Sequence, residues 1–513
     1  MTTIPSFAAG SYVTSRTTAN LVNLKSQLDG LSTQLTTGRT SETYGGLGTD
    51  RSTSLSAHAT LSALDGYDAT ITGTQTRVKL ASASLTQLTS LTTTLRSSIS
   101  NSALNNGATA DNNALLARNS LDAALDALNQ QSAGQYLFGG RDLDTAPVVS
   151  GDVLLNGTTT PKADGLKTVV QEQVDTDLGP AGTGRLTVSA PNSTTVSLAE
   201  ETNTLTRADF GFQFAGAPTA TGSALSVTAQ ASALSTTYNI GLSAQPAIGD
   251  SLSITLKLSD GTTTTVKLTA QSQTTAGSTS GFAIGATTAE TATNLSNALT
   301  GALKNAANTT LAAKSVVDAT TRFFDGGDRI GKDSGGNPVY MSKLSPTDAA
   351  SASNQKSTVQ WYKGEASTTD PRASTTVRIG ATNTAEVGAR ANEDAIKDAL
   401  KSLAAAAVSN VGTTTTTSAA RWQAVATRAT TLLPASGALE EITADFSLAA
   451  SSLSNAQTQN KTTRATLLSA VDRVESVTTE EVAAKLLAVQ NQLQASYQVT
   501  SMLSKLSLVN YLS

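Results

Sequence analysis

The sequence predicts an α+β protein: both ends of the chain form a long antiparallel α-helical coiled-coil bundle, and the middle contributes inserted β-rich domains. Near both ends apolar residues recur at alternating spacings of three and four, the periodicity of a helix that packs against another helix. The middle instead carries short alternating runs separated by Gly, Ser and Thr. Charged residues make up 14% and aromatic residues 4% of the chain, so slender helices and thin sheets are expected rather than a thick core.

The first helix is predicted over residues 14–37, because Gly38 is suited to a left-handed C-terminal cap. A single apolar stripe runs along it, and the last segment of the chain carries a stripe of the same spacing. A stripe this narrow cannot build a core alone, so it must lie against another helix. The residues predicted to pack subunits together are Leu21, Leu24, Leu28, Leu31, Leu35, Val482, Leu486, Val489, Leu493, Val499, Leu503 and Leu506.

Two further helices are predicted before the middle of the chain. The pattern over residues 53–100 predicts a helix of roughly 70 Å, at about 1.5 Å per residue. A third helix is expected over residues 111–131. Between the first two, the glycine-rich stretch 45–48 predicts a loop. A phosphate cradle is disfavoured there, because the stretch lacks a Gly-Lys-Ser/Thr ending and no buried strand precedes it.

The middle, residues 148–376, is predicted to form one or two variable β-rich surface domains. A short apolar run followed by glycines, over 135–147, predicts a strand that leaves the helical bundle. The pair Asp260-Gly261 lies between two alternating apolar runs, which is a strong signal for a β-hairpin. An Ala-rich helix is expected over 288–307.

Helicity is predicted to return at 391–400, to restart near Ala419 after a run of threonines, and to continue beyond Pro434. A four-residue phase step then precedes the last stripe and is expected to unwind a supercoil locally. Because helices at both ends enclose strands, the two ends must be neighbours in space. Residues 1–52 with 465–513 are therefore predicted to form a terminal helical hairpin that mediates polymerisation, and 53–147 with 377–464 a helical bundle core.

The residue types disfavour catalysis. There is no cysteine, which excludes disulfides and thiolate chemistry, and the single histidine, His58, lies in a helical pattern without nearby carboxylate partners. The only dense mixed cluster, Trp361, Tyr362, Lys363 and Glu365, fits a turn packed on a core better than a site. We therefore expect no enzyme activity, no cofactor and no metal.

The charge and hydropathy of the chain limit the classes of partner that it is expected to bind. The net charge is −4 and the pI is about 5.3, so nucleic acid is a poor candidate. No run of about 18 apolar residues predicts a membrane span. The first residues lack a basic segment followed by an apolar one, so no cleaved signal peptide is expected.

Several stretches resemble the bacterial flagellin family, which includes filament subunits and the hook–filament junction protein. The similar stretches are 31–39, where a helix ends in a Thr-Gly-Arg turn, 134–147, 361–365, 370–372, 388–393 and 493–512. Those at 134–147 and 493–512 are closer to the junction type, and those at 361–393 look like alphaproteobacterial members. The resemblance covers roughly residues 1–147 and 360–513 and says little about 150–355.

The resemblance implies a structural subunit of the flagellar axial structure, serving motility and located outside the cell. It also implies export through the flagellar type III apparatus, and as partners further copies of the chain, other axial proteins such as hook-associated proteins and flagellin, and an export chaperone. Filament subunit and junction protein stay open. A secreted adhesin or other surface binding protein, with the helices as a stalk, is the alternative, and truncating 150–355 would discriminate between these functions.

Overall fold

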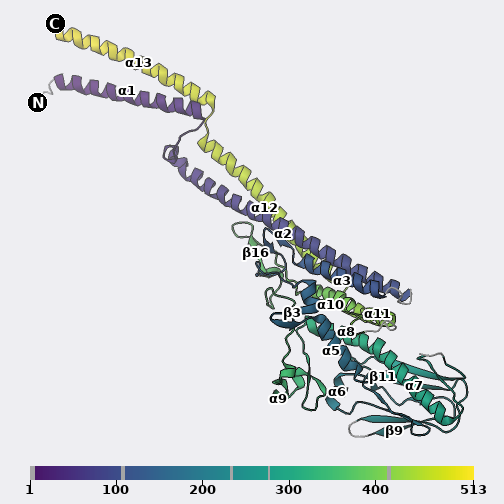
Figure 1. The fold of residues 1–513 in the computed structure, drawn as a ribbon. Coiled ribbons are helices and arrows are strands. Elements are labelled where there is room, and N and C mark those ends of the chain that lie inside the picture. Colours follow the sequence, from purple (N-terminus) through teal and green to yellow (C-terminus); the bar gives the residue numbers. More distant parts are fainter. Residues whose placement is uncertain (1–5, 105–109, 232–234, 275–277, 413–417, 513) are drawn as a thin grey trace. The chain divides into compact units, whose positions relative to one another are not determined.

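The structure is a computed structural model, and it describes residues 6–104, 110–231, 235–274, 278–412 and 418–512. Side chains next to several of these gaps and ends, including those of Leu503 and Leu506, lie outside the description. The protein is mixed α+β, with long helices towards both termini and sheets in the middle of the chain (Figure 1). The chain divides into two compact units: residues 1–75, 377–385 and 451–513 form the first, and residues 76–376 and 386–450 form the second.

Four long helices belong to the two ends of the chain: α1 (Ser6–Thr37), α2 (Arg51–Leu104), α12 (Ala438–Glu475) and α13 (Thr479–Leu512). The other helices are α3 (Ala110–Leu128), α4 (Gly151–Asn156), α5 (Leu166–Leu178), α6 (Thr204–Asp209), α7 (Thr288–Ala306), α8 (Ala312–Phe324), α9 (Pro346–Ala349), α10 (Asp394–Ala407) and α11 (Ser418–Ala429). Short turns of other helical types are η1 (Tyr44–Asp50), η2 (Ala307–Leu311), η3 (Met341–Lys343), η4 (Ala352–Asn354), η5 (Arg372–Ser374) and η6 (Thr430–Leu432).

Most strands are short. They are β1 (Gln131–Ser132), β2 (Gln135–Tyr136), β3 (Gly157–Thr159), β4 (Lys162–Asp164), β5 (Thr187–Val188), β6 (Thr195–Ala199), β7 (Gln213–Phe214), β8 (Thr219–Ala220), β9 (Leu225–Ala231), β10 (Thr236–Leu242), β11 (Ser251–Lys257), β12 (Thr263–Gln271), β13 (Gly281–Ala283), β14 (Ile330–Lys332), β15 (Pro338–Tyr340), β16 (Thr376–Arg378) and β17 (Thr384–Glu386).

The ends of the long helices follow the predicted signals only in part. Helix α1 ends at Thr37 as predicted, and Gly38 takes the left-handed conformation, with φ +67°, that suits a C-terminal cap. Helix α1 starts earlier than predicted. The predicted phase step before the last apolar stripe is not a local unwinding within one helix, so that prediction was wrong. The chain leaves the helical conformation between Glu475 and Thr479, so α12 and α13 are separate helices.

Two sheets form the centre of the second unit. One has the strand order β5-β6-β10-β9, and the other has the order β13-β12-β11-β7 with β8 also paired to β11. The predicted hairpin is confirmed: β11 and β12 are antiparallel, and Gly261 takes φ +84° in the turn between them. The predicted Ala-rich helix is also confirmed, as α7.

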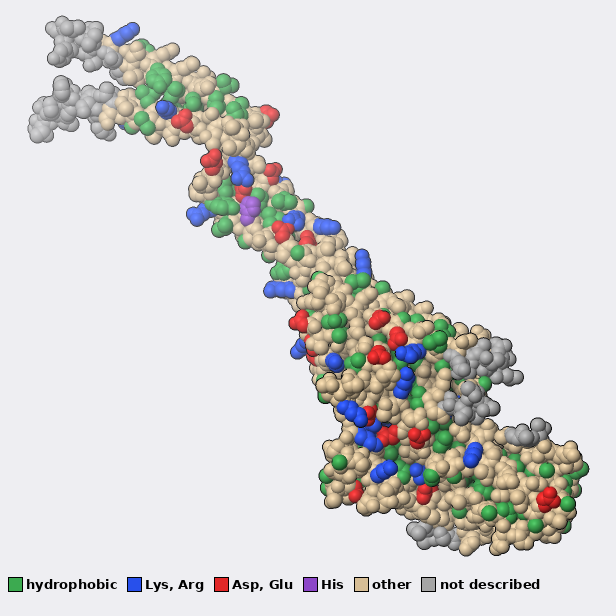
Figure 2. Space-filling view, viewed as in Figure 1, with side chains coloured by type: hydrophobic (Ala, Val, Ile, Leu, Met, Phe, Trp, Pro, Cys, Tyr) green, Lys and Arg blue, Asp and Glu red, His purple; other side chains and the backbone are tan. Residues whose placement is uncertain are grey.

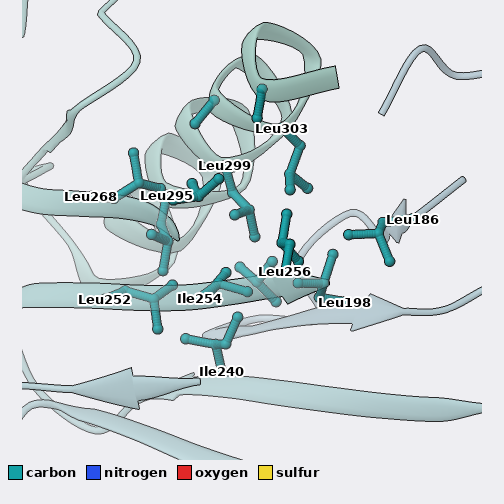
Figure 3. Packing of buried hydrophobic residues seen from close by; sticks show 14 of the residues in the cluster. Leu186, Leu198, Ile240, Leu252, Ile254, Leu256, Leu268, Leu295, Leu299 and Leu303 are labelled. Atoms are coloured by element: carbon teal, nitrogen blue, oxygen red, sulfur yellow. The ribbon is translucent and has the colours of Figure 1, made fainter. Parts of the chain in front are cut away.

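The two sheets share one apolar core with α7. Leu295, Leu299 and Leu303 project from α7 towards the leucine and isoleucine side chains of β11, and Leu198 and Ile240 of the other sheet lie in the same cluster (Figure 3). These residues follow the two-residue period on the strands and the three-to-four-residue spacing on the helix. The sequence pattern therefore predicts the faces that meet in this core.

Two helices of the middle segment, α5 and α8, were not predicted from the sequence. Each buries polar residues on its packed side, and this obscures the apolar period. The Asp177 carboxylate of α5 is fully buried and accepts hydrogen bonds from Ser315 Oγ at 2.7 Å and from the backbone N–H of Gly211 at 2.9 Å. Burial of this carboxylate is tolerated because polar partners surround it.

Backbone hydrogen bonds join the two points where the middle segment enters and leaves the helical part of its unit. Val148 bridges Tyr362 in antiparallel fashion, and Val149 N–H donates to the Trp361 carbonyl at 3.0 Å. Trp361 and Tyr362 are buried, and the indole Nε1–H of Trp361 donates to the Phe324 carbonyl at 2.8 Å. The mixed cluster of the sequence is thus a packed turn that closes the base of the middle segment.

Candidate functional site: the terminal helices

The residues predicted to pack subunits lie on α1 and α13, which belong to the first unit. The two helices contact each other along their lengths and run antiparallel, with the N- and C-termini at the same end of the pair (Figure 1). We call α1 and α13 together the terminal pair. The first and last segments of the chain are therefore neighbours in space.

A backbone clasp joins the connection between α12 and α13 to the residues just after α1. Thr40 N–H donates to the Glu475 carbonyl at 2.7 Å, and Val477 N–H donates to the Gly38 carbonyl at 3.0 Å. The Gln34 side chain turns back and donates from Nε2 to the Thr40 carbonyl at 2.8 Å. These bonds satisfy backbone groups at a helix end, where they have no partner within the helix.

Glu475, the last residue of α12, also binds side chains of α2. Ser54 and His58 are four residues apart on α2 and therefore lie on one face of that helix. Ser54 Oγ donates to Glu475 Oε1 at 2.5 Å, and His58 Nε2 lies 2.7 Å from the same oxygen. The hydrogen bonds from Ser54 and then His58, with the nearby positive charge of Arg39, hold the pKa of Glu475 below its usual value. The expectation that His58 lacks a carboxylate partner was wrong, because its partner is 417 residues away along the chain.

Four of the five residues predicted on α1 share one half-buried line along the helix in a single copy. Leu21, Leu24, Leu28 and Leu31 are half-buried. Leu35 is 38% exposed, and Gln34 takes the half-buried place at the end of the stripe because its side chain is bound to the clasp. Sequence reasoning missed Gln34 because it considered only apolar residues.

On α13 burial decreases along the helix. Val482 is 1% exposed, and Leu486, Val489 and Leu493 are half-buried. The half-buried line then continues through Ser496 and Thr500 at unbroken spacings of three and four, whereas Val499 is 49% exposed. The side chains of Leu503 and Leu506 lie outside the described residues. The unbroken spacing is the signal that could have identified Ser496 and Thr500 in the sequence.

A second set of apolar side chains on the terminal pair faces away from the partner helix. Val22 of α1 is 63% exposed, and Leu487, Tyr497 and Met502 of α13 are 60%, 56% and 58% exposed. Apolar side chains are visible on the face of these helices that Figure 2 shows. The terminal pair therefore keeps apolar surface in contact with water, which costs free energy unless another surface covers it.

The described residues carry no membrane-spanning helix and no cluster of metal ligands. Within them no helix has the length and apolar character needed to cross a membrane. The same residues contain no group of three or more His, Asp or Glu side chains placed to hold a metal ion. Comparisons of the chain with protein-family models, with curated proteins and with solved structures find no match.

Proposed function

We propose that the chain is a self-assembling structural subunit of the bacterial flagellar axial structure, as a filament subunit or as a hook–filament junction protein. In this proposal both ends of the chain form a coiled-coil bundle, and neighbouring copies complete the terminal pair. The β-rich middle faces solvent. The subunit has no catalytic activity, and it reaches the outside of the cell through the flagellar type III export apparatus.

The observation that carries the proposal is the incomplete burial of the terminal pair. Four leucines of α1 and three apolar residues of α13 are only half-buried by the pairing, and further apolar residues are 49% to 63% exposed. Burying a Leu or Val side chain completely stabilises by about 1.5–3 kcal/mol. The terminal pair therefore gains only part of this free energy in one copy, and packing against other copies supplies the rest.

The resemblance to the flagellin family supports the same function independently of burial. Its stretches include 31–39, which ends in the clasp region, and 493–512, which forms the second half of α13. Other axial proteins, an export chaperone and further copies of the chain are the partners that the proposal implies.

Deleting residues 494–513 tests the proposal. The deletion removes the half of α13 that carries most of the exposed apolar residues, including Tyr497, Val499 and Met502. We expect a soluble protein that no longer forms filaments, measured by sedimentation and negative-stain electron microscopy. The second unit should keep its circular dichroism and thermal transition, which serves as the control. Normal polymerisation of the truncated chain would rule out the assembly role.

The choice between filament and junction depends on location rather than on the physics of the helices. Imaging of labelled protein along the whole filament supports a filament subunit, and a signal confined to the hook–filament boundary supports a junction protein. A diffuse secreted protein that binds surfaces would instead favour the adhesin function, for which the two sheets of the middle segment would form the binding module.

A further inference from the structure

The edge strand β9 differs from the other sheet edges of the second unit. It has seven residues, Leu225–Ala231, and pairs on one side only along its whole length. The other edge strands in the described ranges have two or three residues, and the one-sided start of β12, residues 263–268, carries the charged Lys267. An edge strand presents unpaired backbone N–H and C=O groups, and natural proteins usually protect it by shortening it, covering it, or placing charges or proline on it. Strand β9 is long and contains no proline.

The sequence around β9 carries no charge either. Between Asp209 and Asp250 there is no Asp, Glu, Lys or Arg, and this stretch includes all of β7, β8, β9 and β10. Charged residues are one of the usual protections against edge-to-edge pairing. Their complete absence here leaves the β9 edge open to another strand.

The hydrogen-bond pattern shows which backbone groups of β9 face outward. Ser243 N–H donates to the Ala224 carbonyl, whereas Leu242 N–H donates away from β9, to the Thr194 carbonyl of the β6 side. Bonding alternates along an antiparallel pair, so the even-numbered residues of β9 bond to β10. The N–H and C=O groups of Val227 and Ala229 therefore point outward, and among the described residues they have no hydrogen-bond partner.

We propose that β9 pairs with β9 of a second copy of this chain, antiparallel about a two-fold axis at Thr228. Thr228 is the midpoint of the strand, so this register is the one in which all seven residues overlap. It places Val227 of one copy opposite Ala229 of the other, where their outward N–H and C=O groups bond to each other. The result is one continuous sheet across two copies.

A second copy is the occupant that the chemistry of the strand favours. When identical strands pair about a two-fold axis, a charged residue near the axis faces its own like charge, which is destabilising. Strand β9 avoids this cost because it has no charged residue. At the axis Thr228 meets Thr228, a cross-strand pair that stabilises sheets, and the exposed Ser226 and Gln230 face each other.

Single cysteines test this register in the full chain, because the native sequence contains none. Thr228 and its copy would form a non-hydrogen-bonded pair with Cα atoms about 4.5 Å apart, within the range for a disulfide. Ser226→Cys is the matched control, because in this register its two copies are about 13 Å apart along the strands. Under mild oxidation we expect T228C to form a disulfide-linked dimer at least about tenfold faster than S226C, because only T228C meets the disulfide geometry.

The variant Ala229→Pro tests whether pairing between two copies of β9 can be lost while the second unit still folds. It removes an outward N–H that makes no intramolecular bond, and proline is tolerated on edge strands. Added to T228C, it should slow crosslinking about tenfold while the thermal transition of the second unit is kept. If this variant loses its transition, Thr228→Lys replaces it. Thr265→Lys, at an exposed position of β12 in the other sheet, is then the control. Sedimentation velocity should then show weaker self-association for T228K only.

Equal crosslinking of S226C and T228C would overturn the proposal, and so would a lack of any T228C dimer. Crosslinking that a folded A229P variant leaves unchanged would also overturn it. The proposal does not depend on the function of the terminal pair, because β9 belongs to the second unit and the terminal pair to the first. Failure of one proposal is therefore distinguishable from failure of the other.

Discussion

Glu475 connects three segments of the first unit through a single residue. Its backbone carbonyl holds Thr40 of the connection after α1, and its carboxylate holds Ser54 and His58 of α2. The carboxylate side chain is 18% exposed and that of His58 is 41% exposed, so solvent screens the interaction partly. Hydrogen bonds to an ionised group are nevertheless stronger than those between neutral groups.

Replacing this carboxylate with a neutral amide should loosen the clasp. For Glu475→Gln we expect a loss of about 1 kcal/mol in the local stability of the clasp, because a partly exposed ionic hydrogen bond is removed while side-chain size is kept. Hydrogen–deuterium exchange of the Thr40 and Val477 amides measures this local opening. Glu481→Gln, at an exposed position on α13, is the matched control.

The same residue predicts a pH dependence. Because the pKa of Glu475 is lowered in the folded state, its contribution is complete above the unfolded pKa of about 4.3 and is lost as the pH falls through the folded value. On acidification from about pH 6 to pH 3, the wild type should therefore lose more protection at the clasp than E475Q does. Equal losses in the two proteins would contradict this assignment of the pKa shift.

At the scale of the element, α13 carries apolar residues of two kinds. Val482 near its start is buried by the fold of one copy, and Val499 near its end is half exposed. Identical substitutions at the two positions thus separate folding from assembly, because their side-chain chemistry and helix propensity change equally.

Val482→Ala should destabilise the terminal pair of the monomer by about 1–2 kcal/mol, through lost burial and a residual cavity. Val499→Ala should leave monomer helicity unchanged and raise the critical concentration for polymerisation. Circular dichroism at low concentration and pelleting across a concentration series measure the two effects. If V499A destabilises the monomer as much as V482A, the exposed stripe has no separate role in assembly.

At the scale of the whole molecule, the middle segment is an insertion whose two ends meet. Lys363 N–H donates to the Pro147 carbonyl at 2.8 Å, next to the bridge between Val148 and Tyr362. The backbone on either side of the insertion is therefore held together by hydrogen bonds, so a short linker can replace the segment.

Replacing residues 150–360 with a short Gly-Ser linker should leave polymerisation intact, because the terminal pair lies outside the deleted segment. Pelleting and electron microscopy measure this, and retained helical circular dichroism is the control for folding. Loss of assembly in a folded deletion variant would instead favour the adhesin function, in which the middle segment binds the target surface.

The sequence by itself determined the features that depend on local periodicity. The three-and-four spacing predicted the long helices, Gly38 predicted the end of α1, and Asp260-Gly261 predicted the β11–β12 hairpin. These features were predictable because a stripe on one helix, or a turn between two strands, depends on residues close together in the chain.

Only the tertiary structure decided which remote residues meet. It paired His58 with Glu475, ended α12 at that glutamate, and allowed α5 and α8 to bury polar residues by supplying partners from other segments. It also placed β9 at a sheet edge, since strand order depends on pairing between distant segments. A local pattern cannot encode these choices, because each depends on the free energy of contacts between parts of the chain that are far apart in sequence.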